Sequence, residues 1–546
     1  MSRQIFFKKI ILANNYLTRN FWLSGLIILA LSVLFFCYLQ NFTGLVDPDS
    51  FYHAKMALLV KQGTLLKEFP WLPLTMLKDN FANQHFLYHI FLIPFVSFFP
   101  PLLGLKLSAI FFASLAVLAV AWLIYRKEPK ATIAGALLLF SSAAFLFRAG
   151  LAKAPMLSVV LLLLIFYFLR QRRNGWVFGL SFFFVWLHGS WPLVLVLVVI
   201  NNLVNSLFFA LESGQYLANK FWLRLKRFFP LVWFNFWAWL NFRQIILIIT
   251  ALTAGVIINP FFPQNLKFYW QQIGQIAIYN YASQIKVGGE WYPFGVTNLI
   301  SQNNLLFAVF IFLMVLWFMG GWRCQKRNTI VLGWLTLFFL ALTLRAARNI
   351  EYFVPLFLLF IVFSLADIWQ TRRGLFQKIN DLIAGYLKNF SQFKSLIVGY
   401  FVVALIFAWL FGLISSHRDL ASNRIDYFYL AGASQWLKNN TTKGSLVFHD
   451  NWSTWPEIWY YNDHNVYLLG LDPTFLYLQN PTLYQEMVSI TLGEQKQDLW
   501  RLLKQDFKAQ YVLIDKYHQD FLINILRDAG FKRVYQDSQA YIFEVL

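Results

Sequence analysis

The sequence predicts a polytopic α-helical membrane protein that carries a small α/β domain at its C-terminal end. Hydrophobic residues make up 59% of the 546 residues, whereas charged residues make up only 13%, about half of their usual share in soluble proteins. The mean hydropathy is +0.53, and apolar runs close to the length of a membrane span recur along most of the chain. Residues 416–546 instead alternate short strand-like and helix-like segments. This composition excludes a soluble enzyme, a disordered chain and a disulfide-stabilised scaffold.

The formal net charge of +21 would indicate a nucleic-acid partner in a soluble protein. Here the basic residues cluster at the ends of apolar runs, as expected for loops that face anionic lipid headgroups, so we expect no nucleic-acid partner. The two cysteines, Cys37 and Cys324, lie in or beside apolar segments and form neither a disulfide framework nor a zinc site. The basic N-terminal segment precedes an apolar run without a small-residue cleavage site, which predicts an uncleaved first span.

Eleven apolar runs predict membrane spans, because each approaches the ~20 residues needed to cross ~30 Å of hydrocarbon. A twelfth candidate, 86–104, is ambiguous because it contains one histidine and three prolines. The eleven runs are 21–41, 105–125, 131–147, 155–170, 176–190, 191–211, 244–262, 303–321, 329–344, 350–369 and 395–415.

Charge bias decides how segment 86–104 is treated. If it does not cross fully, the basic clusters of the longer loops collect on one side of the membrane. If it does cross, every later cluster moves to the outer side, against the positive-inside rule. We therefore predict a cytoplasmic N-terminus and an external C-terminus, with 86–104 partly inserted or paired with 105–125. The basic clusters are Lys8, Lys9 and Arg19; Arg126, Lys127 and Lys130; Arg170, Arg172 and Arg173; Lys220, Arg224, Lys226, Arg227 and Arg243; Arg323, Lys326 and Arg327; and Arg372 and Arg373.

The predicted domains are a membrane domain, 1–415, with large external loops at 42–85 and 263–302, and an external α/β domain, 416–546. In the second domain SLVFHD, NVYLLG, AQYVLID and AYIFEV have the pattern of short buried strands. The segments QEMVSITLGEQKQDLWRLLKQ and HQDFLINILRDAGF have the pattern of amphipathic helices, and the second is expected to stop at Gly530.

Two acidic residues follow the first span directly. Asp47 and Asp49 lie in LVDPDSFYHAKMALLVKQG, where the residues from Ser50 onward predict an amphipathic helix on the outer surface. Both aspartates could act only as helix caps. Against this, one cap needs one carboxylate, and His53 and Lys55 add polar groups to the same turn. Two carboxylates at a membrane surface suit a divalent cation or acid–base chemistry.

A second acidic candidate lies in the external loop 263–302. Glu290 follows Gly288 and Gly289 in SQIKVGGEWYPFG, and such glycines allow close approach to a ligand or hinge motion of a flap. A single loop glutamate is otherwise a surface residue.

Basic residues also lie at the predicted outer ends of spans. Arg345 and Arg348 occur in RAARNIEYFVP, and Arg148 and Lys153 occur in FRAGLAKAPM. Arginine binds phosphate oxygens through paired hydrogen bonds, although contact with lipid headgroups is an alternative explanation. Cations and carboxylates on one side of the membrane fit a phosphate-bearing lipid handled at an acidic centre.

The chain resembles the C-type (GT-C) membrane glycosyltransferase superfamily, and most of all the catalytic subunit of oligosaccharyltransferases. The resemblance is distributed over nearly the whole chain, and it implies that Asp49 is the essential carboxylate and that Arg345 or Arg348 binds the lipid pyrophosphate. It rests on DPDSFYHAK after the first span, on Arg148 and Gly150, on WLHGSW, on Glu290 with Pro293, and on the external C-terminal domain.

Two departures from that family are visible. Lys153 and Ala154 stand where the family carries its second acidic motif, so a metal site is either rebuilt or absent. The Trp-Trp-Asp signature that reads an asparagine acceptor is degenerate, because NWSTWPEIWYYND contains Trp452 and Trp455 but no adjacent tryptophan pair followed by aspartate. Protein N-glycosylation therefore does not follow from the resemblance.

The resulting hypothesis is a glycosyltransferase of the plasma membrane that uses a sugar linked to a polyprenyl phosphate or pyrophosphate, with the acceptor, a protein or a glycan, on the outer face. Asp49, Asp47 and Glu290 are the expected catalytic residues and also the possible ligands of Mg²⁺ or Mn²⁺. Metal-independent chemistry with Lys153 as a fixed ammonium is the alternative for the cofactor. The donor phosphate is expected to contact Arg345, Arg348, Arg148 and Lys153, and the acceptor or its loop His53, Trp452 and Trp455. The rival hypothesis is a non-catalytic protein that carries lipid-linked glycans.

Overall fold

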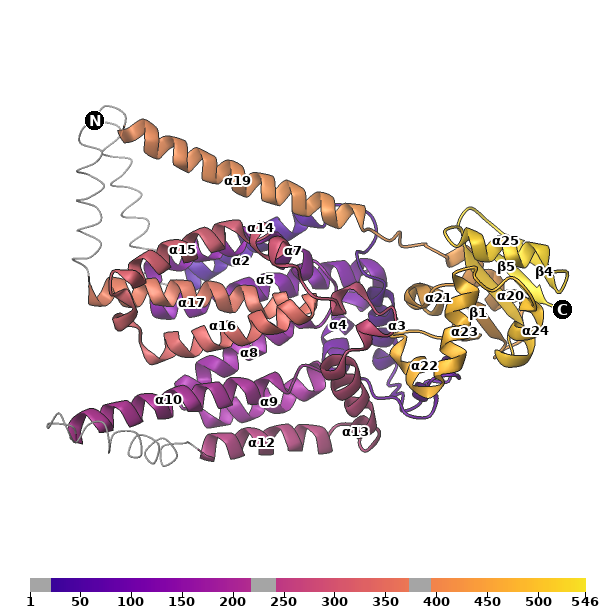
Figure 1. Ribbon diagram of the computed structural model, residues 1–546, viewed down its shortest axis with the longest axis horizontal. Coiled ribbons are helices and arrows are strands. Elements are labelled where there is room, and N and C mark those ends of the chain that lie inside the picture. Colours follow the sequence, from indigo (N-terminus) through magenta and orange to yellow (C-terminus); the bar gives the residue numbers. More distant parts are fainter. Residues whose placement is uncertain (1–20, 218–241, 373–393) are drawn as a thin grey trace.

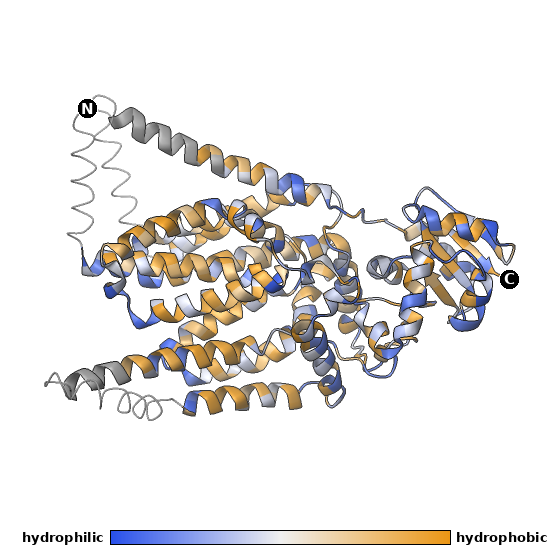
Figure 2. Ribbon diagram, viewed as in Figure 1, coloured by the Kyte–Doolittle hydropathy of each residue, from blue (hydrophilic) through white to orange (hydrophobic). Residues whose placement is uncertain are grey.

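The computed structural model describes residues 21–217, 242–372 and 394–546. It consists of a bundle of apolar helices joined to a C-terminal domain that contains a β-sheet (Figure 1). Hydrophobic residues dominate the bundle helices, and hydrophilic residues gather at the helix ends and in the C-terminal domain (Figure 2). The predicted fold class, a polytopic helical protein with a small C-terminal α/β domain, is confirmed.

Long apolar helices support a multi-pass membrane protein. Among the described residues, four helices are long and apolar enough to cross a bilayer, and a bent pair would make a fifth. The number of 11 spans remains a prediction, because six further apolar helices are shorter. The long spans are α2 (Phe21–Leu39), α5 (Pro101–Lys127), α16 (Arg327–Arg345) and the stretch that contains α17 (Ile350–Thr371). The shorter apolar helices are α4 (Phe86–Phe98), α8 (Pro155–Arg170), α9 (Asn174–Leu187), α12 (Phe242–Ile257), α15 (Asn304–Phe318) and the part Leu193–Phe209 of α10 (Leu193–Leu217). Helix α19 (Lys394–Ser422) precedes the C-terminal domain.

The sequence predicted one span over the apolar run 131–147, but this run is not one continuous helix. It forms α6 (Thr132–Leu139) and α7 (Ala143–Ala149), which meet at a bend of 81°. Ser142 explains the break, because its hydroxyl accepts the amide hydrogen of Phe145 at the start of α7 and donates to Asn303 Oδ1 at 2.5 Å. A serine at a helix N-cap satisfies backbone donors that a continuous helix would pair internally.

Segment 86–104 forms the short helix α4 and the first turn of α5. These two helices pack against each other, and Gly104 allows their close approach, because a Cβ atom at this position would lie 2.5 Å from the carbonyl oxygen of Phe95. Helix α3 (Asp49–Lys61) is not the surface helix that the sequence predicted. It packs against α4, α5 and α21 (Trp455–Tyr461), and Phe51, Tyr52 and Ala54 are buried there.

Basic residues gather at the end of the bundle that lies away from the C-terminal domain. Near the end of α17, Asp367 pairs with Lys127 and accepts hydrogen bonds from the Lys326 amide (2.9 Å) and the Thr329 hydroxyl (2.5 Å). Other basic residues that the sequence assigned to this side lie outside the described residues, namely Lys8, Lys9, Arg19, Lys220, Arg224, Lys226, Arg227 and Arg373.

The C-terminal domain is built around a five-stranded sheet of order β2-β1-β3-β5-β4. β1 is parallel to β2 and β3, whereas β5 is antiparallel to β3 and β4. The strands are β1 (Leu446–His449), β2 (Val466–Tyr467), β3 (Tyr511–Asp515), β4 (Phe531–Gln536) and β5 (Ala540–Val545), and the main helices are α20 (Ala431–Asn440), α21, α22 (Thr474–Gln479), α23 (Pro481–Thr491) and α25 (Gln519–Arg527).

Contacts between distant parts of the chain hold this domain against the segment that follows α2. Lys55 Nζ lies 2.8 Å from Asp463 Oδ2, and the backbones of Leu45 and Ile425 form an antiparallel bridge. The side chains of Trp455 and Trp459 stack with ring centroids 5.2 Å apart and contact Tyr52 of α3. The segment that follows α2 is therefore fixed by residues that follow α19.

Candidate functional site

A cavity of about 1030 Å³ lies where the ends of the bundle helices meet the C-terminal domain. Its volume suits a ligand of substantial size. Six charged residues on its wall form one network of ion pairs and come from four separate segments of the chain. They are Asp47 and Asp49 before and at the start of α3, Arg148 and Lys153 around the end of α7, Glu290 in the loop before α14 (Val296–Ser301), and Arg348 before α17; Lys286, Asp419 and Asp472 also line the wall.

Lys153 lies at the centre of the acidic residues. Its Nζ atom is 2.9 Å from Asp47 Oδ2, 2.8 Å from Asp49 Oδ2 and 3.8 Å from Glu290 Oε2. Asp47 Oδ1 in addition accepts the backbone amide hydrogen of Asp49 at 2.9 Å. Asp47 therefore caps the start of α3 while both aspartates neutralise one ammonium, so capping alone does not explain the pair.

Arg148 forms a second ion-pair centre beside Lys153. Its guanidinium donates to Glu290 Oε2 at 2.7 Å and to Glu351 Oε2 at 2.9 and 3.0 Å. The Glu351 side chain is only 1% exposed and that of Arg148 is 9% exposed, so both charges depend on this pairing. Arg148 is thus largely committed to holding Glu290 in place.

Arg348 pairs with one carboxylate on the cavity wall, whereas Arg148 pairs with two. Its Nη1 atom lies 3.3 Å from Glu290 Oε1, its guanidinium covers the ring of Trp291 at 4.4 Å, and its side chain is 22% exposed. One longer contact with a carboxylate leaves most of the guanidinium hydrogen-bond donors available. The geometry fits recognition of an anionic group such as a phosphate.

Burial and ion pairing together set the pKa values of Asp47, Glu290 and Lys153. Burial raises the pKa of Asp47 to about 6, against the opposing effect of Lys153. Burial would also raise the pKa of Glu290, but the positive charges of Lys153, Arg348 and Arg148 hold it well below its usual value. For Lys153, burial favours the neutral amine, whereas the surrounding carboxylates raise its pKa and keep the ammonium.

A smaller cavity of about 110 Å³ adjoins the same charged residues and is lined by three histidines, His53, His85 and His188. His53 Nδ1 lies 2.8 Å from Nε2 of the buried His89, and the rings of His85 and His188 stack at 5.2 Å. Burial lowers the pKa of His85 to about 3, despite a hydrogen bond with the Leu187 backbone, so this imidazole is neutral at physiological pH.

Some residues predicted from the sequence lie away from the large cavity. Arg345 is exposed and donates to the carbonyl oxygens of Ile278 and Tyr279. Trp455 is buried between the C-terminal domain and α3, and His53 lines the small cavity only. Trp452, which was expected to contact the acceptor or belong to its loop, lines the large cavity.

Sequence reasoning missed two acidic residues at the site, Glu351 and Asp472. Glu351 lies in the first turn of the apolar helix α17, where a carboxylate is unfavourable unless it is paired, so the argument applied to Asp47 and Asp49 would have found it. Asp472 lines both cavities, but its short loop segment carries no comparable signal.

The acidic residues fit an ammonium better than a divalent cation. Asp47, Asp49 and Glu290 were expected to hold Mg²⁺ or Mn²⁺, but all three face Nζ of Lys153 at 2.8–3.8 Å. A divalent ion bound by the same oxygens would lie within a few ångströms of this fixed positive charge, and the repulsion would be strong in a poorly solvated cavity.

Comparison with solved structures identifies the fold. Over 96% of this chain and 74% of the other, the structure superposes on the archaeal oligosaccharyltransferase AglB from Archaeoglobus fulgidus in complex with an inhibitory peptide and a dolichol-phosphate, with a TM-score of 0.61 and 12% identity. The fold is that of the GT-C membrane glycosyltransferases.

Two further structures with the GT-C fold are relevant. ArnT from Cupriavidus metallidurans bound to undecaprenyl phosphate has a TM-score of 0.54 and 12% identity over 95% of this chain and 98% of that one. The A. fulgidus oligosaccharyltransferase in complex with zinc and sulfate has a TM-score of 0.54 and 13% identity over 95% and 73% of the two chains. No protein-family model and no curated protein sequence matches this chain.

Proposed function

We propose that this protein is a membrane glycosyltransferase that transfers a sugar or oligosaccharide from a polyprenyl phosphate or pyrophosphate lipid to an acceptor on the outer face of the plasma membrane. One observation carries this proposal: Asp49, Lys153, Glu290 and Arg348 converge on one cavity at the ends of the bundle helices. Related folds bound to dolichol-phosphate and to undecaprenyl phosphate support the lipid class.

In the proposed reaction an O–H or N–H group of the acceptor attacks the anomeric carbon of the sugar. The bond between this carbon and the phosphate oxygen breaks, and its electron pair leaves with the lipid phosphate. The acceptor proton passes to Asp49, the more exposed of the two aspartates at 38% against 16%. General-base assistance of this kind contributes typically ~10²–10⁴-fold to a rate.

Arg348 serves the departing phosphate in this mechanism. Negative charge grows on the phosphate oxygen as the sugar–oxygen bond breaks, so a fixed guanidinium stabilises the transition state more than the bound donor. Arg348 is held by its ion pair with Glu290 and by the cation–π contact with the ring of Trp291. Glu290 therefore positions the cation and is itself held by Arg148.

Lys153 takes the position that a divalent cation would need. In the proposed mechanism its ammonium contacts both aspartates and offers its remaining donor direction to an oxygen of the donor phosphate. The alternative, a site for Mg²⁺ or Mn²⁺, is favoured by the zinc and sulfate complex of the related oligosaccharyltransferase, and it requires the Lys153 side chain to move aside.

The test is transfer of labelled sugar from a synthetic polyprenyl-linked donor by the purified full-length protein in detergent. Asp49→Asn should reduce transfer by roughly 10²-fold or more, because the amide cannot accept the proton. Asp47→Asn should reduce it less, because Asp47 acts through Lys153 and the start of α3. Equal, mild losses in both variants would overturn the role of Asp49.

The same experiment separates this proposal from the rival non-catalytic carrier. A carrier would bind the labelled lipid donor without releasing labelled sugar to any acceptor, and Asp49→Asn would leave that binding unchanged. A carrier would need only arginines such as Arg348 to bind the lipid phosphate. The acids around Lys153 have no role in simple binding of an anionic lipid.

A further inference from the structure

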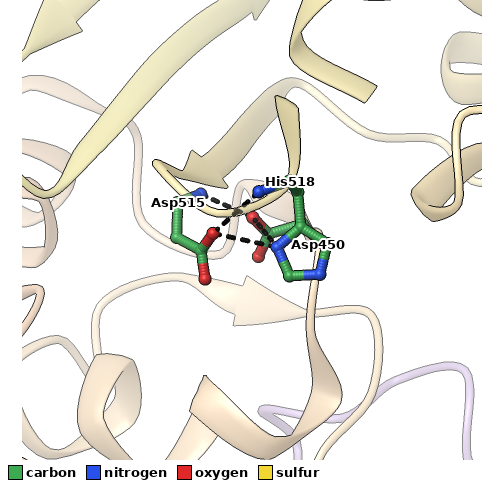
Figure 3. Close-up of side chains that lie close together, drawn as sticks. All are labelled: Asp450, Asp515 and His518. Atoms are coloured by element: carbon green, nitrogen blue, oxygen red, sulfur yellow. Dashed lines mark hydrogen bonds and ion pairs between the residues drawn. The ribbon is translucent and has the colours of Figure 1, made fainter. Parts of the chain in front are cut away.

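A separate cluster of three side chains lies in the C-terminal domain. Asp450 follows β1 directly, Asp515 is the last residue of β3, and His518 precedes α25 (Figure 3). Because β1 and β3 are adjacent and parallel, their carboxyl ends bring both aspartates to one edge of the sheet. His518 Nδ1 lies 3.1 Å from Asp450 Oδ2 and 2.9 Å from Asp515 Oδ1.

The two aspartates differ in how well their oxygens are paired. Asp515 Oδ1 accepts the amide hydrogens of Tyr517 and His518 at 2.7 and 3.2 Å. Asp450 Oδ2 accepts the amide hydrogen of Asp515 at 2.5 Å, but Asp450 Oδ1 is buried and has no hydrogen-bond partner. The Asp450 side chain is 0% exposed, and a buried carboxylate oxygen without a partner is unfavourable unless another group satisfies it.

We propose that Asp450, Asp515 and His518 bind a divalent transition-metal cation of the Mn²⁺ or Zn²⁺ type. One ligand atom from each residue lies within 4.8 Å of the other two, and within the described ranges no other group of three such residues meets this condition. The cation balances two buried carboxylates and gives Asp450 Oδ1 a partner. The imidazole selects against Mg²⁺ and Ca²⁺, which prefer ligand sets made only of oxygen.

The position of the cluster also gives the cation a route and a structural role. The His518 side chain is 27% exposed, so the ion can enter from solvent beside the imidazole. Asp450 directly precedes Asn451, Trp452 and Ser453, which line the large cavity. A bound ion therefore fixes the start of this wall segment. The site itself does not depend on the proposed transferase activity.

The test is metal binding by the purified full-length protein in detergent after treatment with EDTA and desalting. Mn²⁺ is titrated by electron paramagnetic resonance, and Zn²⁺ and Ca²⁺ are then tested as competitors. We expect saturable binding of one equivalent of Mn²⁺, displacement by Zn²⁺ and weak competition by Ca²⁺. His518→Gln and Asp515→Asn should each weaken binding by at least tenfold.

Two controls make the result decisive. His464→Gln alters a histidine of the same domain whose ring nitrogen contacts the Thr441 carbonyl oxygen, and it should bind Mn²⁺ like the wild type. Asp49→Asn should do so too, since a loss of binding there would place the cation at the large cavity and overturn the assignment. If Asp515→Asn does not fold, the partly exposed His518→Gln variant decides.

The proposal is wrong if the wild type shows no saturable binding of Mn²⁺ or Zn²⁺, or if folded His518→Gln binds as tightly as the wild type. The first outcome would mean that His518 is an imidazolium that neutralises two aspartates without a metal, and the second would mean that the cation binds elsewhere in the chain.

Discussion

At the scale of single residues, Lys153 determines the character of the site. One ammonium within 2.9 Å of two aspartates turns a potential metal site into a network of fixed charges. Four carboxylates, Asp47, Asp49, Glu290 and Glu351, face three cations, Lys153, Arg148 and Arg348.

If Lys153 replaces the metal, transfer should persist in excess EDTA and fall by about 100-fold in Lys153→Ala, since a fixed charge near the reacting groups is lost. Lys61→Ala, at the end of α3 and away from the acids, serves as the matched control and should retain activity. The measurement is initial transfer rate with and without EDTA. Complete loss on chelation, restored by Mn²⁺ or Mg²⁺ in the wild type and in His518→Gln alike, would show that the carboxylates around Lys153 form a working metal site.

The pH dependence of transfer should report on Asp47. Its pKa of about 6 lies above the usual aspartate value, so Asp47 is protonated below pH 6 and then no longer balances Lys153. We expect kcat/KM to rise with pH through an apparent pKa near 6, and this rise should be absent in Asp47→Asn. Burial also raises the pKa of Asp472 to about 6, so Asp472→Asn is the control, and a rise that disappears only there would contradict the assignment.

The sequence predicted most of the charged residues that line the large cavity, but it did not predict which of them form ion pairs with one another. Spacing after a span identified Asp47 and Asp49, a predicted span end identified Lys153, and the two preceding glycines in a long loop identified Glu290. No local pattern could show that Arg148 contacts Glu351, because these residues lie 203 positions apart. The same limit explains Arg345, whose neighbourhood in the sequence resembles that of Arg348 although only Arg348 lines the cavity.

At the scale of elements, apolar runs predicted helices well because burial in lipid or protein leaves a simple pattern. The sequence did not predict the bend near Ser142, which depends on Asn303 from a distant segment. Strand β4 was missed because its side chains are half-buried or exposed, so it lacks the buried run of β3. The helix predicted across residues 485–505 is interrupted near Gly493, which has a φ of +75°.

The contact between α4 and α5 can be tested at Gly104. Gly104→Ala places a methyl group 2.5 Å from the Phe95 carbonyl oxygen, and such overpacking costs roughly 1–3 kcal/mol. We expect a lower unfolding temperature in detergent. Gly179→Ala in α9 is the matched control, because its added Cβ meets nothing within 4 Å, and helix propensity there favours alanine. Equal unfolding temperatures in both variants would contradict this account of the contact.

At the scale of the whole molecule, the two ends of the bundle differ in charge and in partners. One end carries Lys127 and Lys326 beside Asp367, and the other carries the cavity and the C-terminal domain (Figure 1). Applied to this polarity, the positive-inside rule assigns the Asp367 end to the cytoplasm and the cavity to the outer face.

A tag placed after Leu546 should therefore be accessible to an impermeant label on intact cells, whereas a tag at Met1 should react only after the membrane is permeabilised. The measurement is labelling of single-cysteine or epitope tags before and after permeabilisation. Protection of the Leu546 tag in intact cells would mean that segment 86–104 crosses fully or that another span is assigned to the wrong side.

The bridge between Leu45 and Ile425 and the ion pair between Lys55 and Asp463, whose residues are 408 positions apart, have a consequence for biosynthesis. The ribosome synthesises Leu45 and Lys55 long before it synthesises Ile425 and Asp463, the residues that contact them. Asp47 and Asp49 therefore reach the membrane surface early but gain their final surroundings only when the C-terminal domain has emerged and docked. Until then the large cavity lacks the part of its wall that Asn451, Trp452 and Ser453 supply, so a chain that terminates before the last domain keeps Asp47 and Asp49 but not the complete cavity.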